Sequence, residues 1–161
     1  MILDQFKLDN KVAIVTGAAR GLGQGIALGL AQAGANIAAV DILDQAETKK
    51  EVEKLGRKCI TIKADLSDAA CVDGIVTTTV KQLGSIDILF NNAGIIRRAP
   101  LTEFTMKDWD DVMNINIRTL FFLSQAVARV MIEQKRGGKI VNTASMLSFQ
   151  GGILVLSLIH I

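Results

Sequence analysis

The sequence predicts an α/β protein in which helices cover both faces of a doubly wound parallel sheet. Short apolar runs alternate with amphipathic segments at the spacing that strand–helix–strand units require. Half of the 161 residues are hydrophobic, which suits one domain with a buried sheet. A glycine-rich turn, residues 16–23, joins the first apolar run to the first amphipathic segment.

The apolar runs predict five strands, and the amphipathic segments predict four helices. The strands are expected near residues 12–16, 36–40, 58–63, 86–90 and 138–143. The helices are expected near residues 22–33, 44–55, 68–83 and 108–134. Ser67 is the expected N-cap of the third helix. Thr105 with Asp108 has the spacing of a capping box at the start of the longest helix.

Residues 12–23 place a strand, a glycine turn and a helix in the order that builds a phosphate-binding site. Gly17 permits the tight turn, Gly21 lets the backbone approach a pyrophosphate, and Gly23 lets helix and strand pack closely. The helix N-terminus presents unpaired N–H groups and the positive end of its dipole to the phosphates. This segment therefore predicts a dinucleotide site.

The second strand ends at Asp41, about 20 residues after the glycine turn, where a carboxylate can accept hydrogen bonds from an adenosine ribose. The same charge would repel a 2′-phosphate, so we expect NAD as the cofactor and not NADP. Two alternatives remain at this stage. Arg20, inside the glycine turn, could favour a 2′-phosphate, and Asp41 could serve only as a turn residue.

Two further polar segments close the third and fourth strands: Asp65-Leu66 and residues 91–94. Ligands of doubly wound sheets bind at the carboxyl ends of their strands. Asn, Asp and Gly are also common turn formers, so either segment alone could be only a turn. Three consecutive strands that end in this way favour a ligand site.

The chain resembles the short-chain dehydrogenase/reductase family over about residues 8–152. Residues 16–23 match the family's T-G-x-x-x-G-x-G motif, and residues 91–94 match its N-N-A-G motif. The resemblance implies a Rossmann-like sheet with strand order 3-2-1-4-5, incomplete after the fifth strand. It further implies contacts to the adenine side and the nicotinamide side of NAD. The coenzyme-binding residues that it implies are Gly17, Arg20, Gly21, Leu22, Gly23, Asp41, Asp65, Leu66, Asn91, Ala93 and Gly94.

The resemblance also implies that Ser145 and Asn116 are catalytic. In the family, the serine polarises the substrate oxygen and the asparagine holds a water in a proton relay. A Tyr-x-x-x-Lys pair completes the group. Asn114 is an alternative match for the asparagine. Ser145 and Asn116 could also be a turn serine and a buried asparagine bonded to backbone.

The tyrosine of this pair is expected near Leu158, and the 161 residues contain no tyrosine. We therefore expect no measurable dehydrogenase activity from this chain. Residues 1–153 are expected to form a partial NAD-binding domain, and residues 154–161 a non-native tail of a truncated or frame-shifted sequence. A genuine short form is the alternative. A non-catalytic NAD-binding module and an unstable fragment are competing interpretations.

Three segments resemble a narrower group of the family, the 2-dehydro-3-deoxy-D-gluconate 5-dehydrogenases, also called 2-deoxy-D-gluconate 3-dehydrogenases. These segments are residues 91–98, 108–114 and 144–152. The resemblance implies a sugar-acid substrate. An arginine fork at Arg97 or Arg98 could bind its carboxylate, and Gln150 could bond to a hydroxyl. The arginines could equally be solvated loop charges, and the substrate could be another sugar or ketone.

Composition argues against several other functions. A net charge of +2 is too small to indicate nucleic acid or an anionic membrane as a partner. Residues 1–10 show no secretory signal and we expect no segment of membrane-spanning length, so the expected location is cytoplasmic. Cys59 and Cys71 are expected to be unpaired core thiols.

The single histidine, His160, cannot support a multi-histidine metal site, and we expect no metal. The acidic group Asp108, Asp110 and Asp111 suits a helix start better than a set of metal ligands. The family resemblance implies that the full-length parent is a homo-oligomer, a tetramer.

Overall fold

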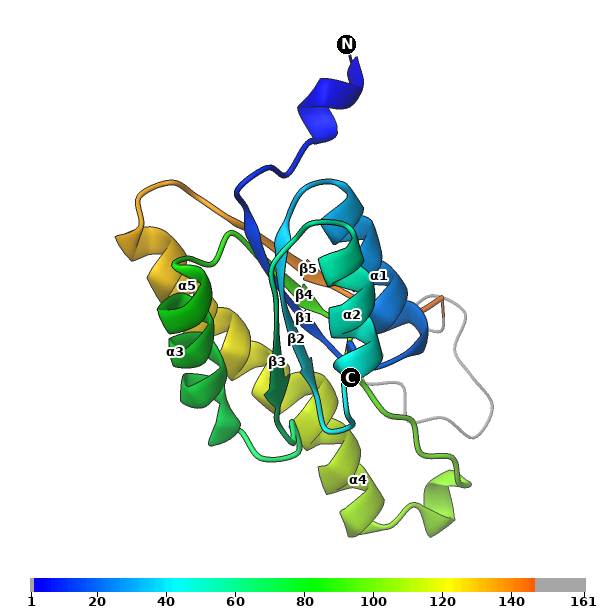
Figure 1. Ribbon diagram of the computed structural model, residues 1–161. Coiled ribbons are helices and arrows are strands. Elements are labelled where there is room, and N and C mark those ends of the chain that lie inside the picture. The colour runs from blue at the N-terminus through cyan, green and yellow to red at the C-terminus, as the bar shows by residue number, and fades with distance from the viewer. Residues whose placement is uncertain (1, 147–161) are drawn as a thin grey trace.

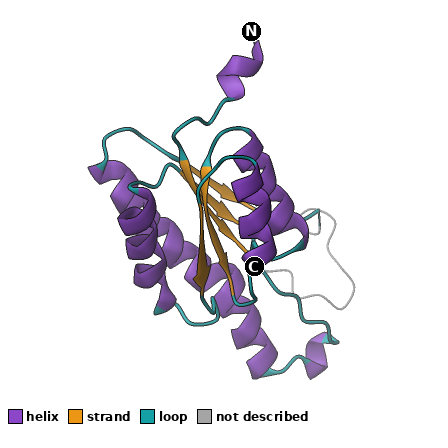
Figure 2. Cartoon of the chain, in the orientation of Figure 1, coloured by secondary structure: helices purple, strands orange, loops and turns teal. Residues whose placement is uncertain are grey.

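The computed structural model describes residues 2–146 as a sheet between two layers of helices (Figures 1 and 2). All five strands are parallel, in the order β3-β2-β1-β4-β5, which confirms the predicted fold class and strand order. The strands are β1 (Val12–Thr16), β2 (Asn36–Asp41), β3 (Cys59–Lys63), β4 (Ile88–Asn91) and β5 (Lys139–Asn142). The helices are α1 (Gly21–Gln32), α2 (Ala46–Lys54), α3 (Cys71–Leu83), α4 (Met106–Met113) and α5 (Leu120–Glu133).

Helix α3 begins later than the sequence predicts, and Ser67 is not its N-cap. The N-cap is Ala70. Two carboxylates hold the preceding backbone in turns instead: Asp65 accepts from the Ser67 amide at 2.8 Å, and Asp68 accepts from the Ala70 amide at 2.9 Å. Local side-chain bonds therefore compete successfully with the helix here. Two short 3₁₀ helices, η1 (Ile2–Phe6) and η2 (Leu101–Glu103), were also not expected.

The longest helix starts as predicted, but it is not uniform. Thr105 Oγ1 accepts a hydrogen bond from the Asp108 amide at 3.0 Å, which confirms Thr105 as the N-cap. The Asp108 carboxylate accepts from the Thr105 hydroxyl at 2.6 Å, whereas in a capping box it would accept from the backbone amide. The helix continues to Glu133, and its middle segment, η3 (Asn114–Thr119), is π-helical. Such wide turns often occur at functional sites. No sequence pattern that we considered predicts this segment.

The two faces of the sheet bury separate sets of side chains. Along β1, Ala13 and Val15 pack with the residues of α1 and α2, whereas Ile14 packs with those of α3 and α5. This follows from the period of two in a strand. Every residue of β1 is buried, as expected for a central strand covered on both sides. The helices on each side therefore determine which residues of β1 face each layer.

Asp87 holds the edge of the sheet at which the strands begin. Its Oδ2 accepts from the Val12 amide at 2.9 Å, and its carboxylate is paired with Arg136 at 3.1 Å and Lys11 at 3.7 Å. Gln134, at the end of α5, bonds to both the amide and the carbonyl of Ile86. A carboxylate that is only 4% exposed is thus compensated by two cations and an amide.

The segment Met106–Glu133 spans 28 residues and is apolar enough to cross a membrane by length and composition alone. This corrects the expectation that no segment has that length. The helix predicted over residues 108–134 already had that length, but Arg118 and Arg129 interrupt its apolar run, and the expectation counted only uninterrupted runs. The inner face of α5 is packed, since Leu123, Val127 and Met131 are buried against the sheet and α3. A helix that covers a sheet passes the same length test, so the test assigns no membrane role.

Cys59 lies in the core between β3 and α2, and Cys71 is half-buried at the start of α3. Both are free thiols. Burial raises the pKa of Cys59 to about 11, and nearby Glu53 adds to the increase. A thiol with such a pKa carries little thiolate at neutral pH, which makes Cys59 a poor nucleophile.

We expect Leu123→Ala to lower the free energy of unfolding by about 2–5 kcal/mol, because it leaves a cavity in a fully packed layer. Ile132→Ala, on the same helix but at a side chain that is 74% exposed, should change it by less than about 0.5 kcal/mol. Urea unfolding followed by circular dichroism measures both. Equal effects of the two substitutions would contradict the packing of α5 described above.

Candidate functional site

The glycine turn after β1 and the N-N-A-G segment after β4 lie side by side at the edge where the strands end (Figure 1). Thr16 joins them. Its hydroxyl accepts from the amides of Asn92 and Ala93, both at 3.0 Å, and its carbonyl accepts from Asn92 Nδ2 at 3.1 Å. The two motifs that the sequence analysis treated separately therefore form one structural unit.

Two glycines of this unit have no room for a side chain. A Cβ atom on Gly23 would lie 1.9 Å from the carbonyl oxygen of Gly17, and one on Gly17 would lie 2.9 Å from Asn92 Nδ2. Gly17 also has a φ of +68°, in the region that favours glycine. The structure thus confirms the predicted tight turn and close helix–strand packing at these positions.

The N-terminus of α1 is left uncapped. Arg20 occupies the N-cap position, and its side chain makes no capping hydrogen bond. No acidic residue lies in the first turn, and Arg20 has no ion-pair partner among residues 2–146. Gly21 has open space where a Cβ would be, and Leu22 beside it is 78% exposed. Free amides, a cation and open space are what a bound phosphate requires.

Asp41 lies at the end of β2 and contacts the glycine turn directly. Its Oδ2 accepts from the Ala19 amide at 2.9 Å, and its Oδ1 accepts from the Leu43 amide at 3.0 Å. Asp41 is therefore both a turn residue and a carboxylate held beside the predicted phosphate site. Each oxygen keeps a second lone pair for a ligand hydroxyl.

The residues after β3 have local roles in this structure. Asp65 is exposed, and its carboxylate accepts from the Ser67 amide. Leu66 is half-buried and packs on the core beneath α3. The adenine contacts that the family resemblance implies for this pair stay predictions.

Asn91 is 4% exposed and ties three elements together. Its Nδ2 donates to Ser124 Oγ of α5 at 3.0 Å and to Asn142 Oδ1 of β5 at 2.9 Å. The side chain thus fixes the end of β4 instead of pointing out of the sheet. The nicotinamide-side contacts that the family resemblance implies for Asn91, Ala93 and Gly94 stay predictions.

Asn116, in the π-helical segment, holds the loop that follows the N-N-A-G segment. Its Oδ1 accepts from the Ile95 amide at 3.0 Å, and its Nδ2 donates to the Ile95 carbonyl at 2.9 Å. A Cβ on Gly94 would lie only 3.3 Å from this Oδ1. Of the two candidate asparagines, Asn116 is the one bonded to the site, and both ends of its amide are occupied by backbone.

Ser145 lies three residues beyond β5 and is exposed, at the same edge of the sheet. The Thr143 amide donates to the Asn91 carbonyl at 3.0 Å, which brings this segment beside the end of β4. Gln150 and the predicted tail, residues 154–161, lie outside the described residues. The structure therefore places Ser145 at the same edge of the sheet as the glycine turn and the N-N-A-G segment.

Arg97 and Arg98 have different environments. Arg97 is paired with Asp108 at 3.4 Å and Asp111 at 3.3 Å, both on α4. Lys107, with Arg97 as a further cation, lowers the pKa of the Asp111 carboxyl. Arg98 is exposed and has no ion pair within residues 2–146. Of the two arginines, Arg98 is thus the one without an ion pair to a described residue.

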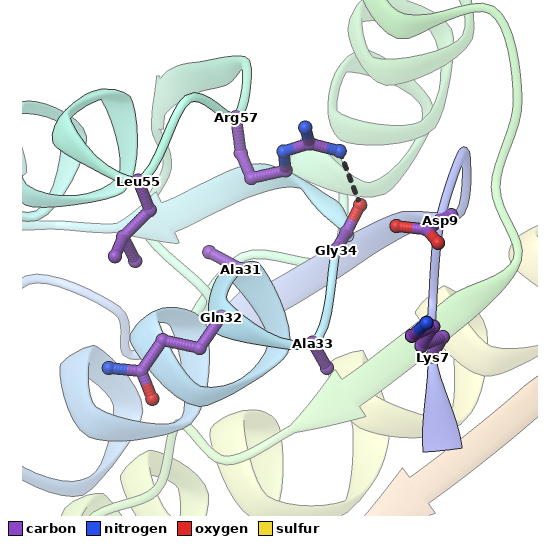
Figure 3. Close-up of a pocket in the computed structure, with 8 residues that line it drawn as sticks. All are labelled: Lys7, Asp9, Ala31, Gln32, Ala33, Gly34, Leu55 and Arg57. Atoms are coloured by element: carbon purple, nitrogen blue, oxygen red, sulfur yellow. Dashed lines mark hydrogen bonds between the residues drawn. The ribbon is translucent and has the colours of Figure 1, made fainter. Parts of the chain in front are cut away.

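A shallow pocket lies at the opposite edge of the sheet (Figure 3). It is lined by the C-terminal end of α1, the turn after α2 and the chain that precedes β1. Its cations have partners: Lys7 pairs with Asp4 at 2.5 Å, and Arg57 donates to the Gly34 carbonyl at 3.2 Å. This pocket contains none of the predicted site residues.

Comparison with known proteins identifies the family. Residues 11–157 match the short chain dehydrogenase family. The chain belongs to this family. Among curated relatives, 2-dehydro-3-deoxy-D-gluconate 5-dehydrogenase of Escherichia coli K12 is 54% identical over 157 residues, with 98% of this chain and 62% of that protein covered. The chain thus spans less than two thirds of this short chain dehydrogenase.

Solved structures of short chain dehydrogenases agree with the fold. One, described as a 2-deoxy-D-gluconate 3-dehydrogenase from Agrobacterium tumefaciens with bound NADP, is 44% identical with a TM-score of 0.84, covering 93% of this chain and 59% of that one. An NAD⁺-bound xylitol dehydrogenase is 36% identical with a TM-score of 0.86, covering 92% and 58%. The family uses nicotinamide coenzymes, and these two neighbours carry different ones.

Sequence reasoning missed the two threonines that hold the glycine turn. Thr16 joins it to the N-N-A-G segment, as described above. Thr48, on α2, donates from its hydroxyl to the Ala18 carbonyl at 2.8 Å. Thr16 could have been singled out as the first letter of the glycine motif, whereas no local pattern marks Thr48.

We expect Gly23→Ala to destabilise the chain by about 1–3 kcal/mol, because its Cβ would force the Gly17 carbonyl to move. Gly25→Ala is the matched control, since a Cβ there meets nothing within 4 Å. In the interior of a helix that change should stabilise by about 0.5–1 kcal/mol. Thermal unfolding measures both. A tolerated Gly23→Ala would contradict the close contact.

Proposed function

We propose that this chain is the coenzyme-binding part of an oxidoreductase that transfers a hydride to or from a keto or hydroxy sugar acid, with NAD as the coenzyme. One observation carries the proposal: the uncapped N-terminus of α1 is locked beside the N-N-A-G segment through Thr16. The names of the relatives support the sugar-acid substrate. Cytoplasmic location stays a prediction.

The preference for NAD rests on Asp41. Its carboxylate is fixed beside the glycine turn, where the ribose next to an adenine is expected. A hydroxyl can donate to this carboxylate, whereas a 2′-phosphate would be repelled by it. Arg20 opposes the preference because it is an unpaired cation in the same turn. We weigh Asp41 more heavily because the glycine turn itself holds it in place.

We expect the 161-residue chain to bind NADH more tightly than NADPH in fluorescence titrations. Asp41→Asn should tighten NADPH binding about 10-fold, the effect of removing roughly 1.4 kcal/mol of repulsion, because it removes the charge but keeps a side-chain oxygen for the Ala19 amide. Asp73→Asn, which removes the same charge on the other side of the sheet, should leave both affinities unchanged. Saturable binding of neither nucleotide would overturn the proposed function.

The chemistry at the substrate would use Ser145 to polarise the reacting oxygen. The nicotinamide supplies the hydride when it is bound, and the chain supplies orientation. Asn116 acts by fixing the Ile95 backbone, since both ends of its amide are used there. Leucine at position 158 has no proton to donate, and the chain contains no tyrosine. We therefore expect coenzyme binding without turnover.

Two other interpretations compete with this proposal. A non-catalytic NAD-binding module would give the same coenzyme titration, so it differs only in failing to bind the sugar acid. An unstable fragment would aggregate before it bound anything. The extensive hydrogen bonding between the glycine turn, α2 and β4 favours a chain that binds.

Arg98 is our candidate for the substrate carboxylate. It follows the N-N-A-G segment closely, is exposed, and has no ion pair with a described residue. Arg97, which the sequence analysis treated as equivalent, is already paired with α4. Gln150 remains a candidate partner for a substrate hydroxyl.

We expect Arg98→Ala to weaken binding of 2-dehydro-3-deoxy-D-gluconate to the NAD⁺ complex by about 10-fold or more, as loss of a charge-assisted hydrogen bond implies. Calorimetric titration measures this. Arg129→Ala removes the same charge on the exposed side of α5 and should have no effect. An unchanged affinity in Arg98→Ala would rule out this role.

The full-length parent is further proposed to be a homo-oligomer, a tetramer. The outer side of α4, η3 and α5 carries exposed apolar side chains, including Trp109, Ile117, Phe121 and Phe122. The two phenylalanine rings contact each other edge to face, with centroids 5.4 Å apart. Grouped aromatic side chains on a surface favour a protein interface.

A further inference from the structure

We propose that Thr48 is a positioning residue for the coenzyme: its hydroxyl holds the glycine turn from α2 so that the first amides of α1 face the pyrophosphate. This inference rests on the proposed function, because it assumes that a dinucleotide binds at the turn. Thr48 lies in the first turn of α2 and is fully buried. The family motifs do not include it.

The hydrogen bonds of Thr48 match the capacity of one hydroxyl. The hydroxyl donates to the Ala18 carbonyl at 2.8 Å, and the Ala19 carbonyl lies 3.5 Å away. It accepts from Gln24 Nε2, on α1, at 3.2 Å. One donor and one acceptor are therefore in use, and the hydroxyl links α2 to both the turn and α1.

The bonds of Thr48 complete the restraint of the turn immediately before α1. The Ala18 amide donates to the Val40 carbonyl at 3.2 Å, and the Ala19 amide donates to Asp41 at 2.9 Å. The Thr48 hydroxyl donates to the Ala18 carbonyl and lies near the Ala19 carbonyl. The backbone polar groups of Ala18 and Ala19 therefore all face β2 and α2.

Arg20 and the free amides at the start of α1 come directly after Ala18 and Ala19 in the sequence. Because α1 lacks a side-chain cap, the direction of these amides depends on how the backbone of Ala18 and Ala19 is held. α2 itself is fastened to the same place, since Gln45 Nε2 donates to the Asp41 carbonyl at 2.9 Å.

Thr48→Val tests this role, because valine keeps the shape of the side chain and removes the hydroxyl. We expect its affinity for ADP-ribose and NADH to fall about 3- to 10-fold, the range for one net hydrogen bond. Thr48→Ser retains the hydroxyl and should restore wild-type affinity. Thr79→Val is the matched control, since Thr79 is equally buried but bonds to Ile75 within α3.

A second readout needs no coenzyme. We expect the amides of Ala18 and Ala19 to exchange with deuterium faster in Thr48→Val than in wild type, and at the wild-type rate in Thr79→Val. Global unfolding would accelerate exchange in the core strands as well, so exchange confined to the turn identifies positioning. If Thr48→Val does not fold, Gln24→Ala removes the donor to the same hydroxyl and should produce a smaller change of the same sign.

The outcomes separate this inference from the proposed function. Failure of wild-type protein to bind ADP-ribose would overturn the coenzyme site, and the positioning role with it. In that case faster exchange of the Ala18 and Ala19 amides in Thr48→Val would show only that Thr48 restrains the turn locally. Wild-type binding with unchanged affinity and exchange in Thr48→Val would overturn the role of Thr48 alone. An equal loss of affinity in Thr79→Val would also overturn it, because the effect would then be one of general stability.

Discussion

The junction at Thr16 is the constraint on which the rest of the site depends. One hydroxyl and one carbonyl bind the backbone and side chain that follow β4, and this holds the glycine turn against a segment more than 70 residues away in sequence. The contact leaves no space for side chains at Gly17 and Gly23. Helix α1 must therefore start where it does, and its uncapped amides must face the open edge of the sheet.

The two edges of the sheet are organised differently. At the edge where strands begin, the Asp87 carboxylate is paired with Lys11 and Arg136, so these charges hold the start of β1 and the segment after α5. Gln134 bonds separately to the Ile86 backbone just before β4. At the edge where strands end, amides and the Arg20 guanidinium are left available, while hydroxyls, side-chain amides and the Asp41 carboxylate hold the backbone in place. The second arrangement is the one that leaves electrostatic attraction for a ligand.

The sequence allowed the fold class, the strand order and the close packing of the glycines to be predicted, because these depend on period, glycine spacing and strand-end residues. It did not separate Arg97 from Arg98, since the partners of Arg97 are on a helix ten or more residues later. For Asn116 it offered an asparagine bonded to backbone as an alternative, which the structure shows. It did not indicate that the Asn91 side chain bonds to α5 and β5. Asp65 and Asp68 delay the start of the predicted third helix because their local hydrogen bonds compete with it.

The π-helical segment between α4 and α5 allows the longest helix to tolerate the deletion of one residue. A turn closed by i→i+5 hydrogen bonds contains one more residue than an α-helical turn, so Asn114–Thr119 behaves as an insertion that the helix has absorbed. Removing one residue there would let the backbone return to α-helical geometry with the faces of α4 and α5 nearly unchanged, whereas a deletion elsewhere in either helix would rotate one face by about 100°. Asn116 would leave Ile95 in the process. The helix can therefore change length most easily at the point where Asn116 holds the loop that follows the N-N-A-G segment.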